Sequence, residues 1–225
     1  PRRQQMIDPR TAVAAPLLTA IFLTLAEGVR RRDAAAAVNA LVALVVAGLP
    51  FVLGATTDLT VGPTLAVWLA AAGLLHAVGM LGPYDSVRWW DTVTHFLSAT
   101  FVAAVCYAGV LVGGVPWPAV ATILFTFVAG LWWELLELVA RELGEAFDVD
   151  PVLVHYGRRD TLLDLVVDVL GAVAVVAVDL RAFVPVVERL LVPSPRLLTR
   201  SVVAVVVGFA ALALVLVALR WRRDG

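Results

Sequence analysis

The stretch DTLLDLVVDVLG, residues 160–171, carries three aspartates inside an otherwise apolar run. Asp160, Asp164 and Asp168 are four residues apart, so in a helix their carboxylates lie on one face over about two turns, roughly 12 Å. An acid in the middle of a membrane costs roughly 2.5–3.5 kcal/mol on insertion scales unless a proton, a cation or a partner compensates its charge. The stretch therefore predicts a membrane helix with a function.

The composition of the whole chain is that of an integral membrane protein. Of its 225 residues, 61% are hydrophobic and 16% are charged, unlike the composition of ordinary soluble domains. The charges fall in short clusters between long apolar runs, which predicts transmembrane helices and not the alternating strands of a barrel. With 17 basic and 18 acidic residues nearly in balance, we expect the lipid bilayer as partner and no nucleic acid; the oligomeric state is left open.

The apolar runs predict an all-α, polytopic transmembrane helical bundle that forms a single integral-membrane domain over residues 1–225. About seven spans are expected, at 11–27, 34–53, 63–81, 90–112, 118–140, 160–180 and 201–219. A short interfacial helix is expected at 182–192, where apolar and charged residues alternate. The first run also resembles a cleaved secretory signal, but the arginines at 30–32 follow it in place of a small-residue cleavage site, which favours a span.

Acids and one histidine gather near the ends of three expected spans. Asp91 and His95 share a face at the start of the fourth span, because they are four residues apart. With seven spans, the start of the fourth, the end of the fifth and the start of the sixth lie at the same membrane face. The residues expected at that face are Asp91, His95, Glu134, Glu137, Asp160, Asp164 and Asp168.

The arginines give a weaker indication of orientation. Ten of the 17 lie near span ends on the side of the acids and seven lie on the other side. Since basic residues favour the cytoplasmic side, we expect a multi-pass protein of the cell membrane with its acidic cluster facing the cytoplasm.

Such a cluster favours cation binding. Six carboxylates in a site of low dielectric constant cannot all be ionised unless protons or cations compensate them. Oxygen donors with one histidine suit a divalent metal, Mg²⁺ or Mn²⁺, and suit Zn²⁺ or iron less well. The expected metal ligands are Asp91, His95, Glu134, Glu137, Asp164 and Asp168, and all of these except Glu137 are also candidate catalytic residues.

A purely structural explanation covers part of the cluster. It pairs Asp91 with His95, pairs Glu137 with Arg141, and makes Asp160 the cap of the sixth span. This explanation gives no role to Asp164 or Asp168, and only a partial one to Glu134. Two single polar residues elsewhere, Asn39 and His76, are expected to form interhelical hydrogen bonds.

The order of these motifs resembles a known family. D-x-x-x-H at Asp91, E-x-x-E at Glu134 and D-x-x-x-D-x-x-x-D-x-x-G-A from Asp160 are similar to the YjdF-type inner-membrane proteins of unknown function. More distantly, the pattern resembles the VanZ-like membrane proteins. The resemblance covers about residues 82–175, although YGRRD precedes Asp164 where the family has a glycine-rich approach. It implies a multi-span bundle and supplies no reaction.

Three functions stay open on the sequence alone. The first is a metal-dependent enzyme acting on a lipid or polyprenyl phosphate, in which the metal activates water or holds a phosphate. The second is a proton- or cation-coupled transporter, since carboxylates within a membrane mark ion pathways. The third is a structural membrane protein whose polar cluster only fixes the packing of its helices.

Overall fold

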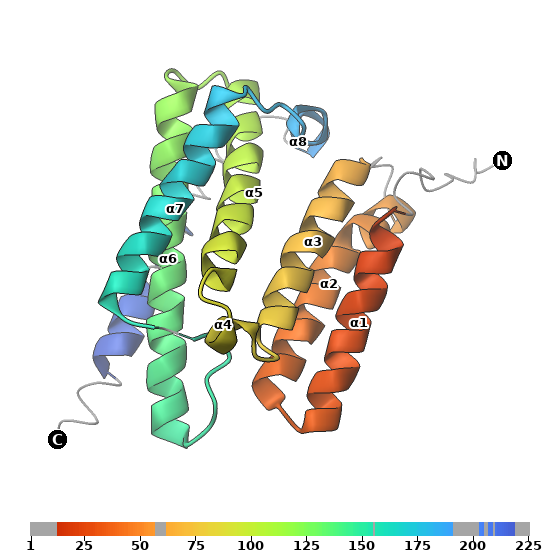
Figure 1. Cartoon of the computed structure of the whole chain (residues 1–225). Coiled ribbons are helices and arrows are strands. Elements are labelled where there is room, and N and C mark those ends of the chain that lie inside the picture. Colours follow the sequence, from red (N-terminus) through yellow and green to blue (C-terminus); the bar gives the residue numbers. More distant parts are fainter. Residues whose placement is uncertain are drawn as a thin grey trace. The chain divides into compact units, whose positions relative to one another are not determined.

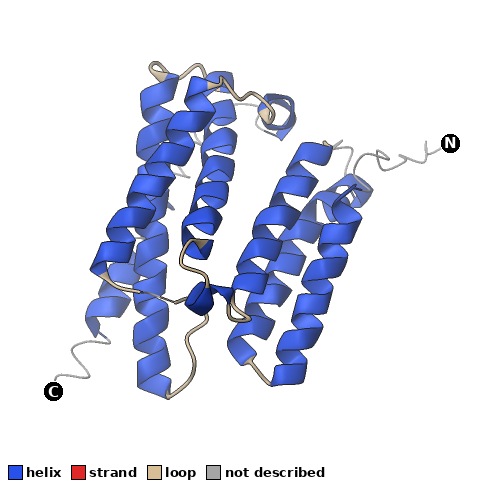
Figure 2. Ribbon diagram, in the orientation of Figure 1, coloured by secondary structure: helices blue, strands red, loops and turns tan. Residues whose placement is uncertain are grey.

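The computed structural model describes residues 13–56, 62–154, 156–190, 203–204, 207–208 and 210–218. Within these residues the regular structure is helical and contains no strand (Figure 2). The helices are α1 (Ala14–Arg31), α2 (Ala34–Thr56), α3 (Pro63–Gly79), α4 (Pro83–Ser86), α5 (Trp90–Val112), α6 (Pro118–Phe147), α7 (Arg158–Ala177) and α8 (Val184–Leu190). The prediction of an all-α protein is thus confirmed for the described part of the chain.

Among the described helices, three are long and apolar enough to cross a bilayer: α2, α5 and α6. Apolar α3 is shorter, and the charged residues in α1 and α7 lower the hydropathy of those two helices. Three of the seven expected spans are therefore supported by helices of sufficient length and hydropathy. Of the expected seventh span, residues 203–204, 207–208 and 210–218 are helical, and the others lie outside the described residues, as do residues 11–12 of the first.

The chain divides into two compact units, Pro1–Phe101 and Val102–Gly225, with the boundary inside α5. In the first unit, α1, α2 and α3 pack against one another side by side (Figure 1). Small side chains make this contact, as is common between membrane helices, because they let the backbones approach closely. The fully buried alanines are Ala14, Ala36, Ala40, Ala47, Ala66, Ala70 and Ala77.

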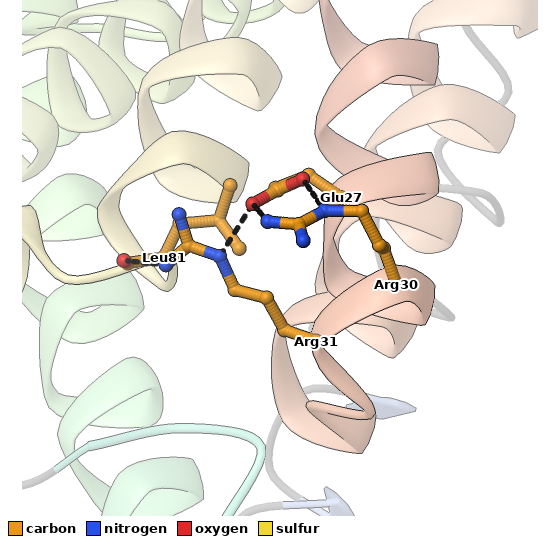
Figure 3. A network of polar contacts seen from close by, with 4 residues as sticks. All are labelled: Glu27, Arg30, Arg31 and Leu81. Atoms are coloured by element: carbon orange, nitrogen blue, oxygen red, sulfur yellow. Dashed lines mark hydrogen bonds and ion pairs between the residues drawn. The ribbon is translucent and has the colours of Figure 1, made fainter.

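Polar contacts close the ends of these helices. Asp33 caps α2, since its Oδ1 accepts a hydrogen bond of 2.8 Å from the backbone N–H of Ala36. Near the end of α1, Glu27 accepts hydrogen bonds of 2.6 Å from Arg30 and Arg31 (Figure 3). Arg31 also donates to the carbonyl oxygen of Leu81 at 3.1 Å. This second contact ties the end of α1 to the turn that follows α3.

In the second unit, α6 and α7 pack along each other (Figure 1). The loop after α7 is fixed to α5, because Tyr107 donates a 2.7 Å hydrogen bond to Asp179 Oδ1. Arg181 donates to the other oxygen of Asp179 at 2.8 Å. The short α8 begins one residue after buried Phe183 and matches the helix expected at 182–192, of which residues 191–192 lie outside the described part.

Two local expectations were wrong. The fifth span was expected to end at residue 140, but α6 continues to Phe147, and its C-cap Asp148 has a left-handed φ of 53°. The residues from Glu142 to Phe147 are mostly good helix formers, and intrinsic propensity outweighs their polarity. Asp160 is not the N-cap of α7. The N-cap residue is Gly157, which has no side chain to bond the helix end, and Asp160 lies in the first turn. A carboxylate there still faces the positive end of the helix dipole.

Candidate functional site

Two of the predicted site residues lie on one stripe of α6. Glu134 and Glu137 follow Gly130 by four and seven residues, a spacing that repeats on one face of a helix. Both side chains are buried, with exposed fractions of 4% and 8%, and both oxygens of Glu134 are inaccessible to solvent. A carboxylate oxygen of Glu134 lies within 4.8 Å of one of Glu137. The stripe thus brings two carboxylates together inside the protein.

Two more carboxylates come from α7. Asp164 and Asp168 are four residues apart and are 2% and 5% exposed, while Asp160, four residues earlier, is only partly buried. The aspartate repeat of the sequence is therefore one helical stripe, as predicted, and it enters the interior at Asp164. The other buried residues of α7 are apolar: Val167, Gly171, Ala172 and Val175.

A glycine allows α7 to approach α6 at the level of these acids. A Cβ added to Gly130 would overlap Asp168 Oδ2 and would lie 3.1 Å from Leu165 Cδ2. The carboxylate of Asp168 therefore occupies the space that the missing side chain leaves on α6. This contact gives a physical reason for the otherwise unfavourable glycine inside a helix, and it shows that Asp168 faces α6.

The donors near Glu137 differ from those that the sequence suggested. Trp133 Nε1 donates a 2.8 Å hydrogen bond to Glu137 Oε1, from four residues earlier on the same helix. Arg141, which the structural explanation paired with Glu137, lies 3.4 Å from Glu142 Oε1 and 3.7 Å from Glu145 Oε1. The indole is a neutral donor, so it orients the carboxylate without cancelling its charge.

The remaining predicted site residues, Asp91 and His95, belong to the first unit. They lie in the first two turns of α5, and His95 Nε2 is 3.9 Å from Asp91 Oδ1, within ion-pair distance. His95 is 8% exposed. The pairing expected from their spacing is thus confirmed. Their membership of one site with the carboxylates of α6 and α7 stays a prediction.

The first unit also contains a network of polar side chains. Of its residues, the sequence suggested only Asn39 and His76. His76 Nε2 lies 2.9 Å from Asn39 Oδ1, which confirms the expected hydrogen bond between α2 and α3. His76 Nδ1 lies 2.7 Å from the hydroxyl of Tyr84, and that hydroxyl lies 3.3 Å from Thr94 Oγ1. Tyr84 and Thr94 were missed, because a lone tyrosine in a loop and a threonine in a span carry no spacing signal.

Comparison with known proteins places the chain in a family. A model of the predicted membrane protein family DUF2238 matches residues 12–184. The chain belongs to this family. The match confirms the YjdF-type resemblance inferred from the acidic motifs, and it covers every predicted site residue.

A relative from Thermotoga maritima, described as an uncharacterised protein, is 27% identical to the chain over 134 residues. The aligned region covers 54% of the chain and 65% of the relative, so it leaves about a third of that protein unmatched. No solved structure matches the chain significantly. The comparisons therefore establish a protein of the lipid bilayer and assign it no reaction.

Proposed function

We propose that this membrane protein binds a divalent cation through carboxylates of α6 and α7, and uses it in a reaction on a lipid or polyprenyl phosphate. The observation that carries the proposal is the burial of Glu134, Glu137, Asp164 and Asp168 on two helices that pack together. Four carboxylates in a site of low dielectric constant need protons or cations to compensate their charge. A divalent cation supplies two positive charges at one point.

The donor set supports a hard metal ion. Four carboxylates offer only oxygen, which Mg²⁺ and Mn²⁺ prefer. Two oxygens bound to one such ion lie at most roughly 4–5 Å apart, twice the metal–oxygen distance. The oxygens of Glu134 and Glu137, within 4.8 Å of each other, meet that limit. A bound ion would then hold the phosphate of a lipid or lower the pKa of a coordinated water.

A structural role is the second candidate, and two contacts favour it. Trp133 donates to Glu137, and Asp168 fills the space beside Gly130. Both contacts would fix the rotation and approach of α7 on α6 without any ion. The test must therefore separate an ion site from a packing device.

Measurements of metal content and thermal stability separate an ion site from a packing role. The protein, purified in detergent without chelator, is expected to carry Mg²⁺ or Mn²⁺ and to melt at a higher temperature when Mn²⁺ is added. Glu134→Gln and Asp164→Asn should each abolish this rise, because each removes a charged ligand and keeps the side-chain shape. Glu145→Gln is the matched control, since Glu145 lies on the same helix with its side chain 49% exposed. Asp91→Asn tests whether Asp91 belongs to the same ion.

The outcomes divide the candidates. A wild-type chain that holds no metal and shows no Mn²⁺-dependent rise would contradict the cation site and leave the structural role. A metal-loaded chain should next release phosphate from a polyprenyl phosphate or diphosphate in lipid nanodiscs, and Asp164→Asn should release none. Metal binding without phosphate release from any such lipid would contradict the enzymatic part.

We also propose the full topology of seven spans in the cell membrane, with the acidic ends at the cytoplasmic face. Helices α1 and α7, with 18 and 20 residues, reach about 27 and 30 Å, close to the thickness of the hydrocarbon core. The arginine count supports the orientation. In a Cys106→Ala background, Asp85→Cys and Val149→Cys should resist a membrane-impermeant maleimide in intact cells, while Val115→Cys should react. The reverse pattern would invert the orientation.

A further inference from the structure

The end of α6 carries an exposed surface on which acids and apolar side chains lie together. Its residues are Glu145, Phe147, Asp148, Val149 and Asp150, and all five are exposed. Phe147 and Val149 are exposed to 71% and 61%. Exposed apolar groups that are rimmed by polar residues are typical of an interaction surface. We refer to these five residues as the α6 end surface.

The α6 end surface extends past the hydrocarbon core of a bilayer. Helix α6 has 30 residues and is therefore about 45 Å long, whereas the core is about 30 Å thick. Its charged residues gather toward its C-terminal end, where Arg141, Glu142 and Glu145 follow one another closely, so this is the end that leaves the core. Lipid tails therefore do not explain why Phe147 and Val149 are exposed.

The acids of the α6 end surface suit a cationic partner. The surface contains three acids and no base. Within the residues that the structure describes, Asp148 and Asp150 form no ion pair and no side-chain hydrogen bond. Glu145 lies 3.7 Å from Arg141, whose guanidinium also lies 3.4 Å from Glu142. Local arginine thus compensates the acids only in part.

A contact between helices shows which segment of the chain comes near this surface. Gly208 and residues 210–218 are helical, and a Cβ at Gly208 would lie 2.6 Å from the ring of Trp132 on α6. Residues 210–218 run in the direction of the C-terminal end of α6 (Figure 1). Ala218 follows Gly208 by ten residues, which is about 15 Å of helix. Ten residues along α6 lead from Trp132 to Glu142, so the two helices reach a similar level.

The residues that follow Ala218 complement the α6 end surface. Arg220, Trp221, Arg222 and Arg223 come within five residues of Ala218, and an extended chain covers roughly 3.3–3.6 Å per residue. We propose that segment 220–223 docks on the α6 end surface, with its arginines on the acids and Trp221 on the exposed apolar side chains. A guanidinium binds a carboxylate through two parallel hydrogen bonds, and an indole covers a large apolar area. The inference does not depend on a bound ion.

The competing partner of this segment is the headgroup of an anionic lipid, because arginines after a membrane span are attracted to such lipids. Two observations favour the α6 end surface. Asp148 and Asp150 lack a cation in the described part of the chain, and Phe147 and Val149 are exposed beside them. A lipid headgroup would compensate the arginines and leave these four residues as they are.

Proteolysis of the full chain tests the docking. In maltoside micelles free of anionic lipid, trypsin cleavage after Arg220, Arg222 and Arg223 is followed by mass spectrometry. Asp148→Asn combined with Asp150→Asn should speed this cleavage about threefold or more, because each exposed ion pair contributes up to roughly a fivefold factor. Asparagine tolerates the left-handed φ of 53° at residue 148, so the helix end should stay intact. Glu188→Gln, which neutralises an exposed acid of α8, is the control and should leave the cleavage rate unchanged.

Two outcomes of the proteolysis would overturn the proposal. The first is an equal cleavage rate in the wild type and in the variant with both asparagines. The second is protection that appears only in nanodiscs with phosphatidylglycerol and persists in that variant, which would assign the segment to the lipid.

A cross-link tests the same placement without changing any charge. In a Cys106→Ala background, Val149→Cys with Trp221→Cys should form a disulfide on oxidation. Val115→Cys with Trp221→Cys is the control pair and should not, because Val115 lies before the start of α6, at its other end. Salt at 1 M should slow the first cross-link, since it screens exposed charges. A cross-link between positions 149 and 221 that forms no faster than the one between 115 and 221 would contradict the docking.

Discussion

Helices α2 and α3 of the first unit and helices α6 and α7 of the second bury polar groups in opposite ways. Between α2 and α3, a buried amide meets an imidazole: Asn39 and partly buried His76 are joined by a hydrogen bond, among fully buried alanines. On α6 and α7, the buried polar groups include four carboxylates, those of Glu134, Glu137, Asp164 and Asp168. Both arrangements lie in helices of a membrane protein, where burying a polar group costs free energy.

The difference shows which buried polar groups can be explained by a structural role alone. A neutral donor and acceptor that meet across a helix pair satisfy each other, and their bond needs no further role. Carboxylates need more than hydrogen bonds, because their charge must be compensated or removed by protonation. This contrast is why we propose a function for the acids of α6 and α7 and a structural role for the bond between Asn39 and His76.

The largest effect is expected where a side chain is added between α6 and α7. Gly130→Ala should lower the free energy of unfolding by about 1–3 kcal/mol, the usual cost of overpacking, because the new Cβ overlaps Asp168 Oδ2. Gly48→Ala is the control in α2: a Cβ there meets no atom within 4 Å, so the better helix propensity of alanine should stabilise the protein by up to about 1 kcal/mol. Unfolding by SDS in mixed micelles measures both.

A second substitution identifies the cause of that loss. If the Asp168 carboxylate is what the new methyl group meets, Asp168→Ala should recover most of the stability that Gly130→Ala removes. Equal losses with and without Asp168→Ala would show that α7 approaches α6 in some other way, and the contrast between the two helix pairs would weaken.

Much of the fold could be predicted from residue spacing. The apolar run 90–112 coincides with α5, and the aspartate repeat after residue 160 is one stripe of α7. Boundaries failed where polarity and helix propensity disagree, as in the last turn and a half of α6. The helix α4 was not expected, because a four-residue helix after Gly82 and Pro83 is too short to show a period. The expectation of a single domain over the whole chain stays a prediction.

Less of the candidate site was predictable. Spacing on one helix predicted the contact of Asp91 with His95. Glu134 and Glu137 were expected at the same membrane face, and their oxygens lie within 4.8 Å of each other. Spacing could not predict that Trp133 would donate to Glu137, because Arg141 is also four residues from Glu137 along the helix. The approach of Asp168 to Gly130 depends on the packing of two helices, which no single helical pattern specifies.

An effect of intermediate size is expected in the neutral network. Asn39→Ala removes the partner of His76 Nε2, together with the bond from Asn39 Nδ2 to the carbonyl oxygen of Ala35, and should destabilise the protein. A double-mutant cycle with His76→Ala should give a coupling energy of about 0.6 kcal/mol, the average for hydrogen bonds between membrane helices, and at most about 1.7 kcal/mol. A coupling energy near zero would mean that the bond between α2 and α3 contributes nothing to the stability of this unit.

The smallest effect is expected at Asp179, outside both helix pairs. The Arg181 guanidinium, and after it the Tyr107 hydroxyl, hold the pKa of Asp179 below its ordinary value of 3.8. A lowered pKa in the folded state stabilises the protein above the unfolded pKa, and this contribution disappears as the pH falls through the folded pKa. Asp179→Asn should therefore reduce the melting temperature slightly at pH 6 and less at pH 3. Asparagine tolerates the left-handed φ of 49° at this position, so backbone strain should not obscure the result.

Because the side chains of Asp179 and Arg181 are 53% and 60% exposed, solvent and salt screen the pair, and 1 M NaCl should remove most of the difference. Arg181→Gln should flatten the pH dependence more than Tyr107→Phe does; the opposite order would show that the hydroxyl, and not the guanidinium, is the main partner.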